Sequence, residues 1–172
     1  MLPRIRSSRR RLARARSGFS LIEILITVAI GAIVASLGAP MIARTRDAFA
    51  VRAARRNLVN VVEAARSAAT QRGRPARFIV RGNAALAVVD TAPPGQPATG
   101  TLTVLAPQPF DVDYHVTVQL ANSADSVVTY DARGFANPRL GRVARIRLVG
   151  RSTRDSVCLT NFGQLLPPGC AP

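Results

Sequence analysis

The residues Gly18-Phe19-Ser20-Leu21-Ile22-Glu23 open an apolar segment that runs as far as Ala43, and this segment is the main indication of the fold. Between Leu21 and Ala43 the sole ionisable side chain is that of Glu23. As a helix, this stretch measures about 35 Å at 1.5 Å per residue, which exceeds the roughly 30 Å of hydrocarbon in a bilayer. We therefore expect residues 19–43 to form a transmembrane helix.

The segment ahead of this helix is strongly basic. Residues 1–18 hold seven arginines and no acidic residue, so their removal lowers the formal net charge of the 172-residue chain by seven, from +15 to +8. Basic residues that flank a membrane helix stay on its cytoplasmic side. We therefore expect a cytoplasmic leader and a periplasmic C-terminal part.

Two other signals share a basic start and an apolar core. A secretory signal peptide has an apolar region of about 7 to 15 residues before a small-residue cleavage site. Here the apolar run is longer and lacks such an ending. The stretch Ser8-Arg9-Arg10-Arg11-Leu12 fits a twin-arginine signal only as loosely as any arginine-rich leader does. Neither alternative accounts for the glycine, the aromatic residue and the glutamate together.

The junction resembles the signal of type IV prepilins, and the resemblance covers residues 13–43. It implies that a prepilin peptidase removes residues 1–18 by cutting after Gly18 and methylates the new terminal amine of Phe19. It also implies that Glu23 pairs with the terminal amine of a neighbouring subunit during filament assembly, since a lone carboxylate is costly in hydrocarbon. The alternative role of Glu23 is to favour a helix N-terminus. Pro40 matches a family proline at which the helix kinks or loosens.

Beyond Arg44 the composition changes from apolar to amphipathic. Apolar residues recur at three- and four-residue steps, and Gly73 followed by Pro75 signals the end of the helix. The predicted inward face consists of Val51, Ala54, Leu58, Val61, Val62, Ala65, Ala68 and Ala69. We expect one helix from about Leu21 to Gln71, with residues 44–74 as its amphipathic second half.

Residues 75–172 are predicted to form a β-rich head. Segments of alternating apolar residues are separated there by turn residues. The expected strands are 77–80, 85–89, 102–105, 115–120, 127–130, 143–149 and 156–159, the first two joined by a Gly82-Asn83 turn. Residues 90–100, which include three prolines, are expected to form an exposed loop. The fold class is therefore α+β, a long N-terminal helix packed on an antiparallel sheet.

Two C-terminal motifs, Tyr130-Asp131-Ala132-Arg133-Gly134 and Cys158-Leu159-Thr160-Asn161-Phe162-Gly163-Gln164, resemble the GspH/FimT group of minor pilins and pseudopilins. The resemblance implies the type IV pilin-like fold and a low-copy subunit at or near a filament tip. The implied partners are the prepilin peptidase, other minor and major pilins or pseudopilins, an inner-membrane assembly platform and the lipid bilayer. The implied location is the bacterial inner membrane, crossed once.

The sequence offers little material for catalysis or metal binding. His115 is the sole histidine, so neither a histidine metal cluster nor a standard triad can form, and no cofactor or metal is expected. Asp111, Asp113, Asp125 and Asp131 carry the oxygen ligands that calcium takes, but their spacing fits no defined calcium loop. Loop aspartates commonly cap turns instead. The chain is predicted not to be an enzyme.

Two cysteines, Cys158 and Cys170, lie near the C-terminus. In the oxidising periplasm inferred from the charge distribution, we expect them to form a disulfide that ties the C-terminal tail to the last strand. Two free thiols are the alternative.

Arginines also gather in the last third of the chain. Alternate residues of a strand share a face, so Arg145 and Arg147 are expected to project together. The candidate DNA contacts are Arg142, Arg145, Arg147, Arg151 and Arg154. An ordinary solvated face is the alternative. Some pilus relatives bind DNA through a C-terminal Gly-Arg-x-Arg element, where this chain has Gly163-Gln164.

The function expected from these observations is structural. We expect a minor pseudopilin that assembles into the tip of a periplasmic pseudopilus for type II protein secretion. The alternative is a type IV pilus minor pilin involved in pilus biogenesis and in DNA binding or uptake. The sequence does not separate the two, because both machines use the same subunit design.

Overall fold

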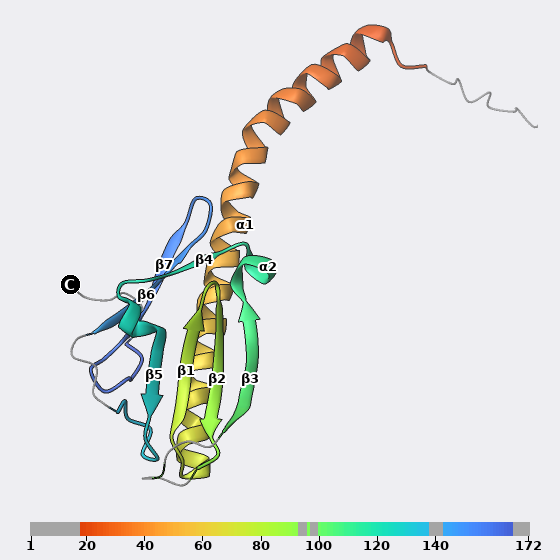
Figure 1. Ribbon diagram of the computed structural model, residues 1–172. Helices are drawn as coiled ribbons and strands as arrows, with labels where there is room; N and C mark the ends of the chain where they lie inside the picture. The colour runs from red at the N-terminus through yellow and green to blue at the C-terminus, as the bar shows by residue number, and fades with distance from the viewer. Residues whose placement is uncertain (1–17, 93–95, 97–99, 138–142, 167–172) are drawn as a thin grey trace, which may run out of the picture. The chain divides into compact units, whose positions relative to one another are not determined.

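The computed structural model describes residues 18–92, 96, 100–137 and 143–166 (Figure 1). The chain divides into two units, Met1–Pro40 and Met41–Pro172, and one helix, α1 (Leu21–Arg72), runs through both. The helix begins after Ser20, whose carbonyl oxygen accepts hydrogen bonds from the backbone N–H groups of Glu23 and Ile24 at 3.0 and 3.2 Å. The helix predicted from the sequence is confirmed to within one residue at each end.

In the first unit, α1 is apolar on all sides. The large side chains of this part are more than half exposed, for example 61% for Ile33 and 73% for Leu37. The hydroxyl of Thr27 donates to the carbonyl of Glu23 at 2.9 Å, so this polar group is satisfied within the helix. By length and composition, α1 is the one helix of the described residues able to cross a membrane.

Pro40 is the last residue of the first unit. The backbone is helical before, at and after this proline. Local melting is therefore not seen in the single chain, and the kink at Pro40 stays a prediction.

In the second unit, α1 buries one face. The eight helix residues that are buried are the eight predicted from the sequence, Val51, Ala54, Leu58, Val61, Val62, Ala65, Ala68 and Ala69. The helix ends at Gly73, whose φ of +60° is accessible to glycine without strain. The backbone N–H of Arg74 then donates to the carbonyl of Ala69 at 3.2 Å, which completes a Schellman-type cap.

Two antiparallel sheets form the head, where the sequence predicted one. The first has the strand order β3-β2-β1-β5 and contains β1 (Ala76–Arg81), β2 (Ala84–Asp90), β3 (Thr101–Pro109) and β5 (Val127–Tyr130). The second has the order β4-β6-β7 and contains β4 (Thr117–Leu120), β6 (Ala144–Val149) and β7 (Arg154–Leu159). Figure 1 shows β1 and β2 in front of the second half of α1, with the β6–β7 hairpin beside it.

The core of the head lies between the helix and both sheets. Its largest fully buried side chains include Tyr130, Phe78, Phe110, Leu58, Ile146, Leu148 and Leu159. The β1–β2 turn links the two sheets, because the side chain of Asn83 donates to the carbonyl of Val116 and accepts from the backbone N–H of Val118. The two sheets therefore share one core with the helix.

The strand predicted at 115–120 was wrong at its start. The sequence did not predict α2 (Phe110–Tyr114), and His115 is its C-cap, in the left-handed conformation with φ +54° and ψ +38°. Burial of Phe110 and the hydrogen bond from the Val116 N–H to the Phe110 carbonyl at 3.1 Å close this single turn. A short helix, the 3₁₀ helix η1 (Ser123–Ser126), also occupies the turn expected before β5.

Candidate functional site

The three residues directly ahead of α1 are exposed and lie in open space. Gly18, Phe19 and Ser20 are exposed, and the Phe19 side chain is 78% exposed. A Cβ atom built on Gly18 would meet no atom within 4 Å, and its φ is not positive. The fold therefore places no demand for glycine at this position, so we attribute the glycine to a requirement outside the chain.

Glu23 lies exposed in the first turn of α1, one turn before Thr27. Within the described residues its carboxylate has no hydrogen bond or ion pair. The neighbouring side chains Ile22 and Ile24 are apolar and 62% and 53% exposed. A carboxylate in such surroundings is costly in lipid unless a cationic group meets it. The described part of the chain therefore supplies no cationic partner for this acid.

A second candidate site lies on the β4-β6-β7 sheet. Along β6 the residues facing the core, Ala144, Ile146 and Leu148, are buried, and Arg145 and Arg147 project from the opposite face, as predicted. The register pairs Arg147 with Gln119 of β4 and with Ser156 of β7, and places Arg154 opposite Val149. Three guanidinium groups thereby come to one face of the sheet.

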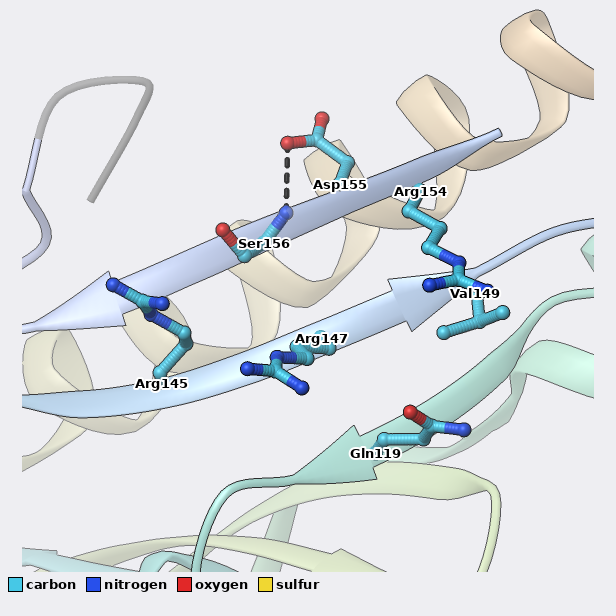
Figure 2. A pocket seen from close by; sticks show the side chains of 7 residues that line it. All are labelled: Gln119, Arg145, Arg147, Val149, Arg154, Asp155 and Ser156. Carbon is cyan, nitrogen blue, oxygen red and sulfur yellow. Dashed lines mark hydrogen bonds between the residues drawn. The ribbon is translucent and has the colours of Figure 1, made fainter. Parts of the chain in front are cut away.

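This face contains an open hollow of about 490 Å³ (Figure 2). It is lined by Gln119, Arg145, Arg147, Val149, Arg154, Asp155 and Ser156. Asp155 is the sole carboxylate among these, and it forms an ion pair with Arg55 of α1 at 3.7 Å. The hollow is therefore a positively charged surface suited to an anionic ligand.

The turn of the β6–β7 hairpin is fixed to α1 by one carboxylate. Asp47 accepts hydrogen bonds from the backbone N–H groups of Arg151 and Ser152 at 3.0 and 2.6 Å, and from the Ser152 hydroxyl at 2.8 Å. These bonds, the one from the Ser152 N–H first among them, lower the pKa of Asp47 to about 2. A Cβ on Gly150 would lie 2.5 Å from the Asp47 carboxylate, so only glycine allows this approach.

The two C-terminal motifs fold into two similar turns. In the first, the Asp131 carboxylate accepts the backbone N–H groups of Arg133 and Phe135. In the second, the Thr160 hydroxyl accepts those of Phe162 and Gln164. Each turn contains a glycine with positive φ, at +79° for residue 134 and +77° for residue 163.

The two turns interlock. The buried hydroxyl of Tyr130 donates to the Gly163 carbonyl at 2.9 Å, and the Ala136 N–H donates to the Phe162 carbonyl at 2.7 Å. Phe135 and Phe162 meet edge to face with ring centroids 6.3 Å apart. Burial is the main cause that raises the pKa of Tyr130. The motifs therefore join the ends of both sheets, and their role is structural.

The other predicted site residues have separate positions. Asp111 and Asp113 lie on α2, while Asp131 is occupied by its turn. The described residues contain no group of three or more metal-ligating side chains. The described residues therefore contain no candidate calcium site.

Two of the predicted site residues lie outside the described residues. Cys158 is buried on β7 and is not a free thiol. Its expected partner Cys170 lies outside the described residues, so the pairing stays a prediction. The candidate DNA contact Arg142 also lies outside them.

Two features were not predicted from the sequence. One is the contact of Asp47 with the β6–β7 turn, and the other is the hydrogen bond from the Tyr130 hydroxyl to the Gly163 carbonyl, which we call the tyrosine lock. Asp47 bonds to residues 104 and 105 positions away, and in the sequence it is one acid among arginines. The signal that was available for the lock is the pair of D-x-x-G and T-x-x-G patterns, because both are turn-forming.

Two family models match the chain. The model of the prokaryotic N-terminal methylation motif matches residues 13–39. The model of type II transport protein GspH matches residues 54–163. Among curated proteins there is no match.

Two crystal structures of the type IV minor pilin FimU of Pseudomonas aeruginosa have a similar fold. One is 15% identical over 74% of this chain and 91% of FimU, and the other is 18% identical over 70% and 96%. The TM-score is 0.50 in both cases. At this identity the likeness concerns the fold alone, and it confirms the predicted type IV pilin-like fold.

Proposed function

Because the model of type II transport protein GspH matches well over half of the chain, the chain belongs to that family, and we propose that it assembles into the tip of a periplasmic pseudopilus for type II protein secretion. Members of the family are structural pilin subunits and not enzymes. The chain is thus a membrane-anchored minor pseudopilin or pilin. The proposal rests on one observation above all. A methylation motif and a GspH domain stand in one chain, and the motif includes Glu23, which has no ion-pair partner among the described residues and lies on an exposed apolar helix.

The first step of the proposed function is processing. A prepilin peptidase cuts after Gly18 and methylates the amine of Phe19, both of which are exposed. The arginine-rich leader keeps the N-terminus cytoplasmic and places the head in the periplasm. Mass spectrometry of the mature chain tests this step, with a mass that begins at methylated Phe19 as the expected result. A chain that still carries residues 1–18 would contradict it.

The second step is docking into the filament. The carboxylate of Glu23 attracts the terminal amine of a neighbouring subunit, because opposite charges in a medium of low dielectric attract strongly. The pair aligns the two helices and removes the cost of burying either charge alone. Exposed side chains such as Ile26 and Ile33 then pack in the filament core instead of against lipid.

Substitution of Glu23 tests the docking step. Glu23→Gln keeps the shape and removes the charge, and we expect the variant to remain in the membrane but to be lost from sheared filaments. Thr27→Val is the matched control, since it alters a polar residue one turn further along the same side of the helix without altering charge. Normal incorporation of Glu23→Gln would contradict the proposal.

A deletion separates the two machines. If the subunit serves type II secretion, its loss stops the release of secreted proteins and leaves surface pili unchanged. The reverse result, normal secretion with fewer pili, assigns the subunit to a type IV pilus. The two outcomes are distinct because each fibre has its own readout.

DNA binding is a second candidate function, favoured by the hollow on the β4-β6-β7 sheet. Arg145, Arg147 and Arg154 line it, and phosphate contacts from arginine supply most sequence-independent DNA affinity. Gel retardation by the full chain in detergent tests this candidate. Arg145→Gln with Arg147→Gln is expected to weaken retardation and reduce its salt dependence. Absence of retardation at low salt would remove the candidate.

A further inference from the structure

The arginines around the start of the head differ from those of an ordinary solvated face in one respect. Residues 41–56 and 143–159 together hold nine arginines and two carboxylates, those of Asp47 and Asp155. Asp47 accepts three hydrogen bonds from the β6–β7 turn, and Asp155 pairs with Arg55. The two carboxylates offset only two of the nine guanidinium charges, so these segments keep a net formal charge of +7.

The β6–β7 turn lies close to the end of the apolar stretch. Asp47, which holds the turn, comes four residues after Ala43, a distance of about 6 Å along the helix. Whatever the tilt of the helix, this point lies no further than that from the plane that contains Ala43. The headgroup layer on each side of a bilayer is about 5–8 Å thick. The backbone of Asp47 is therefore at headgroup depth when the apolar stretch is in the membrane, and the turn is bound to the side chain of this residue.

Several exposed arginines share this depth. Arg44 directly follows the apolar stretch and lies on the same side of the helix as Asp47, one turn earlier. Arg151 is exposed, and its backbone N–H is one of the three groups that donate to the Asp47 carboxylate. Arg46 is exposed as well. Long basic side chains at the end of a membrane helix readily extend into the headgroups.

An exposed aromatic residue lies at nearly the same level. Phe49 is 63% exposed and is the one large hydrophobic residue of α1 beyond Ile42 that is exposed. Its Cα is about 9 Å beyond Ala43 along the helix. Aromatic and basic residues together are typical of a surface that lies in a membrane interface.

The other arginines of the hairpin are further away. A second contact, Asp155 with Arg55, lies eight helix residues beyond Asp47, so the hairpin follows α1 away from the apolar stretch. Arg147 and Arg145 are three and five residues from Gly150, about 10 and 16 Å along the strand. This separation divides the basic surface into a part near the membrane and a part beyond its reach.

We propose that Arg44, Arg46 and Arg151 form a site at the base of the head that binds the phosphate headgroups of anionic phospholipids. The site holds the unassembled subunit at a defined height in the bilayer and releases its lipids when the helix is drawn into a filament. The inference depends on the membrane-anchored helix and not on which machine the subunit serves. The charge complementarity is with phosphate, and the depth selects lipid over DNA.

The test measures the lipid preference of the processed chain, residues 19–172, in phosphatidylcholine vesicles, because the seven arginines of the leader would themselves attract anionic lipid. Trace spin-labelled phosphatidylglycerol or spin-labelled phosphatidylcholine is added, and electron paramagnetic resonance gives the fraction of each that the protein immobilises. We expect a several-fold preference for phosphatidylglycerol, since each basic residue near the surface contributes up to about five-fold. High salt is expected to reduce the preference.

Two pairs of substitutions locate the site. Arg44→Gln with Arg151→Gln is expected to lower the preference several-fold, and the further substitution Arg46→Gln is expected to bring it close to one. Arg145→Gln with Arg147→Gln removes the same charge at the distant positions and is expected to leave it unchanged. Arg44→Lys with Arg151→Lys keeps the charge and should keep the preference, which excludes misfolding as the cause of a loss.

Three outcomes would overturn the proposal. The first is a wild-type chain with no preference for phosphatidylglycerol. The second is an equal loss in the near and distant glutamine pairs, because only the net charge would then matter. The third is an unchanged preference in the near pair together with weaker DNA retention, which would assign these arginines to nucleic acid.

Discussion

The two halves of α1 have similar helical backbones and opposite surroundings. In the first unit the large apolar side chains are exposed on every side, with Leu37 at 73%. In the second unit the apolar residues form one buried face, and Leu58 is fully buried. Leucine side chains are thus available for contacts outside the chain in the first half of α1 and pack in the core of the head in the second half. The exposure of the apolar side chains along this one helix therefore distinguishes two parts. One part is available to lipid and to neighbouring subunits, and the other stabilises the fold of the head.

The largest expected effect tests this difference with two matched substitutions. Leu58→Ala removes a buried side chain and leaves a cavity, so it should lower the free energy of unfolding of the head by about 2–5 kcal/mol. Leu37→Ala should leave that free energy unchanged within about 0.5 kcal/mol. Urea unfolding of the full chain in detergent, followed by tyrosine fluorescence, measures both, because Tyr130 lies in the core of the head. Equal effects of the two substitutions would contradict the difference between the two halves of α1.

A second pair of substitutions, at Gly163 and Gly73, separates two reasons for a glycine. One is a positive φ, and the other is the lack of room for a Cβ atom. A Cβ on Gly163 would lie 2.8 Å from the Tyr130 ring, and its φ of +77° disfavours other residues. Gly73 has a similar φ of +60° and open space around it. Gly163→Ala should therefore cost about 2–5 kcal/mol, from backbone strain and overpacking together.

The control Gly73→Ala should cost only the backbone part, about 1–2 kcal/mol. The same urea titration measures both variants, and tyrosine fluorescence also reports displacement of the Tyr130 ring. If the two alanine variants lose the same stability, the tyrosine lock contributes no steric constraint of its own.

The sequence predicted the features of the fold that follow from a local period. A helical period fixes which residues share a face, so the buried face of α1 was predicted residue by residue. Strand alternation likewise placed Arg145 and Arg147 together. The turn at His115 was not predictable from local pattern, because it depends on burial of Phe110 in a core built from distant strands.

The candidate sites divide in the same way. Gly18, Phe19 and Glu23 were singled out by a signal that is contiguous in the sequence, and their roles stay predictions. The hollow was not predictable without the register of β7 on β6. This register places Arg154 on the same face of the sheet as Arg147. The Asp47 contact required the fold of the whole second unit, since its partners lie more than 100 residues away.

The smallest expected effect concerns this Asp47 contact, which ties the start of the buried half of α1 to the β6–β7 turn. Hydrogen bonds lower its pKa to about 2 from an ordinary value of 3.8. A carboxylate with a lowered pKa in the folded state contributes stability above the unfolded-state pKa, and this contribution is lost as the pH falls through about 4 towards 2.

Asp47→Asn should therefore lower the stability of the head modestly at pH 7 and remove its part of the decline between pH 4 and pH 2. Urea midpoints at pH 7, 4 and 2.5 measure the difference between wild type and variant, which should shrink as the pH falls. Asp113→Asn is the control, because Asp113 is exposed on α2 with no hydrogen bond to its carboxylate among the described residues. If the difference in urea midpoint between wild type and Asp47→Asn stays constant with pH, the charge of Asp47 does not stabilise the turn. The two halves of α1 would then differ only in how their side chains pack.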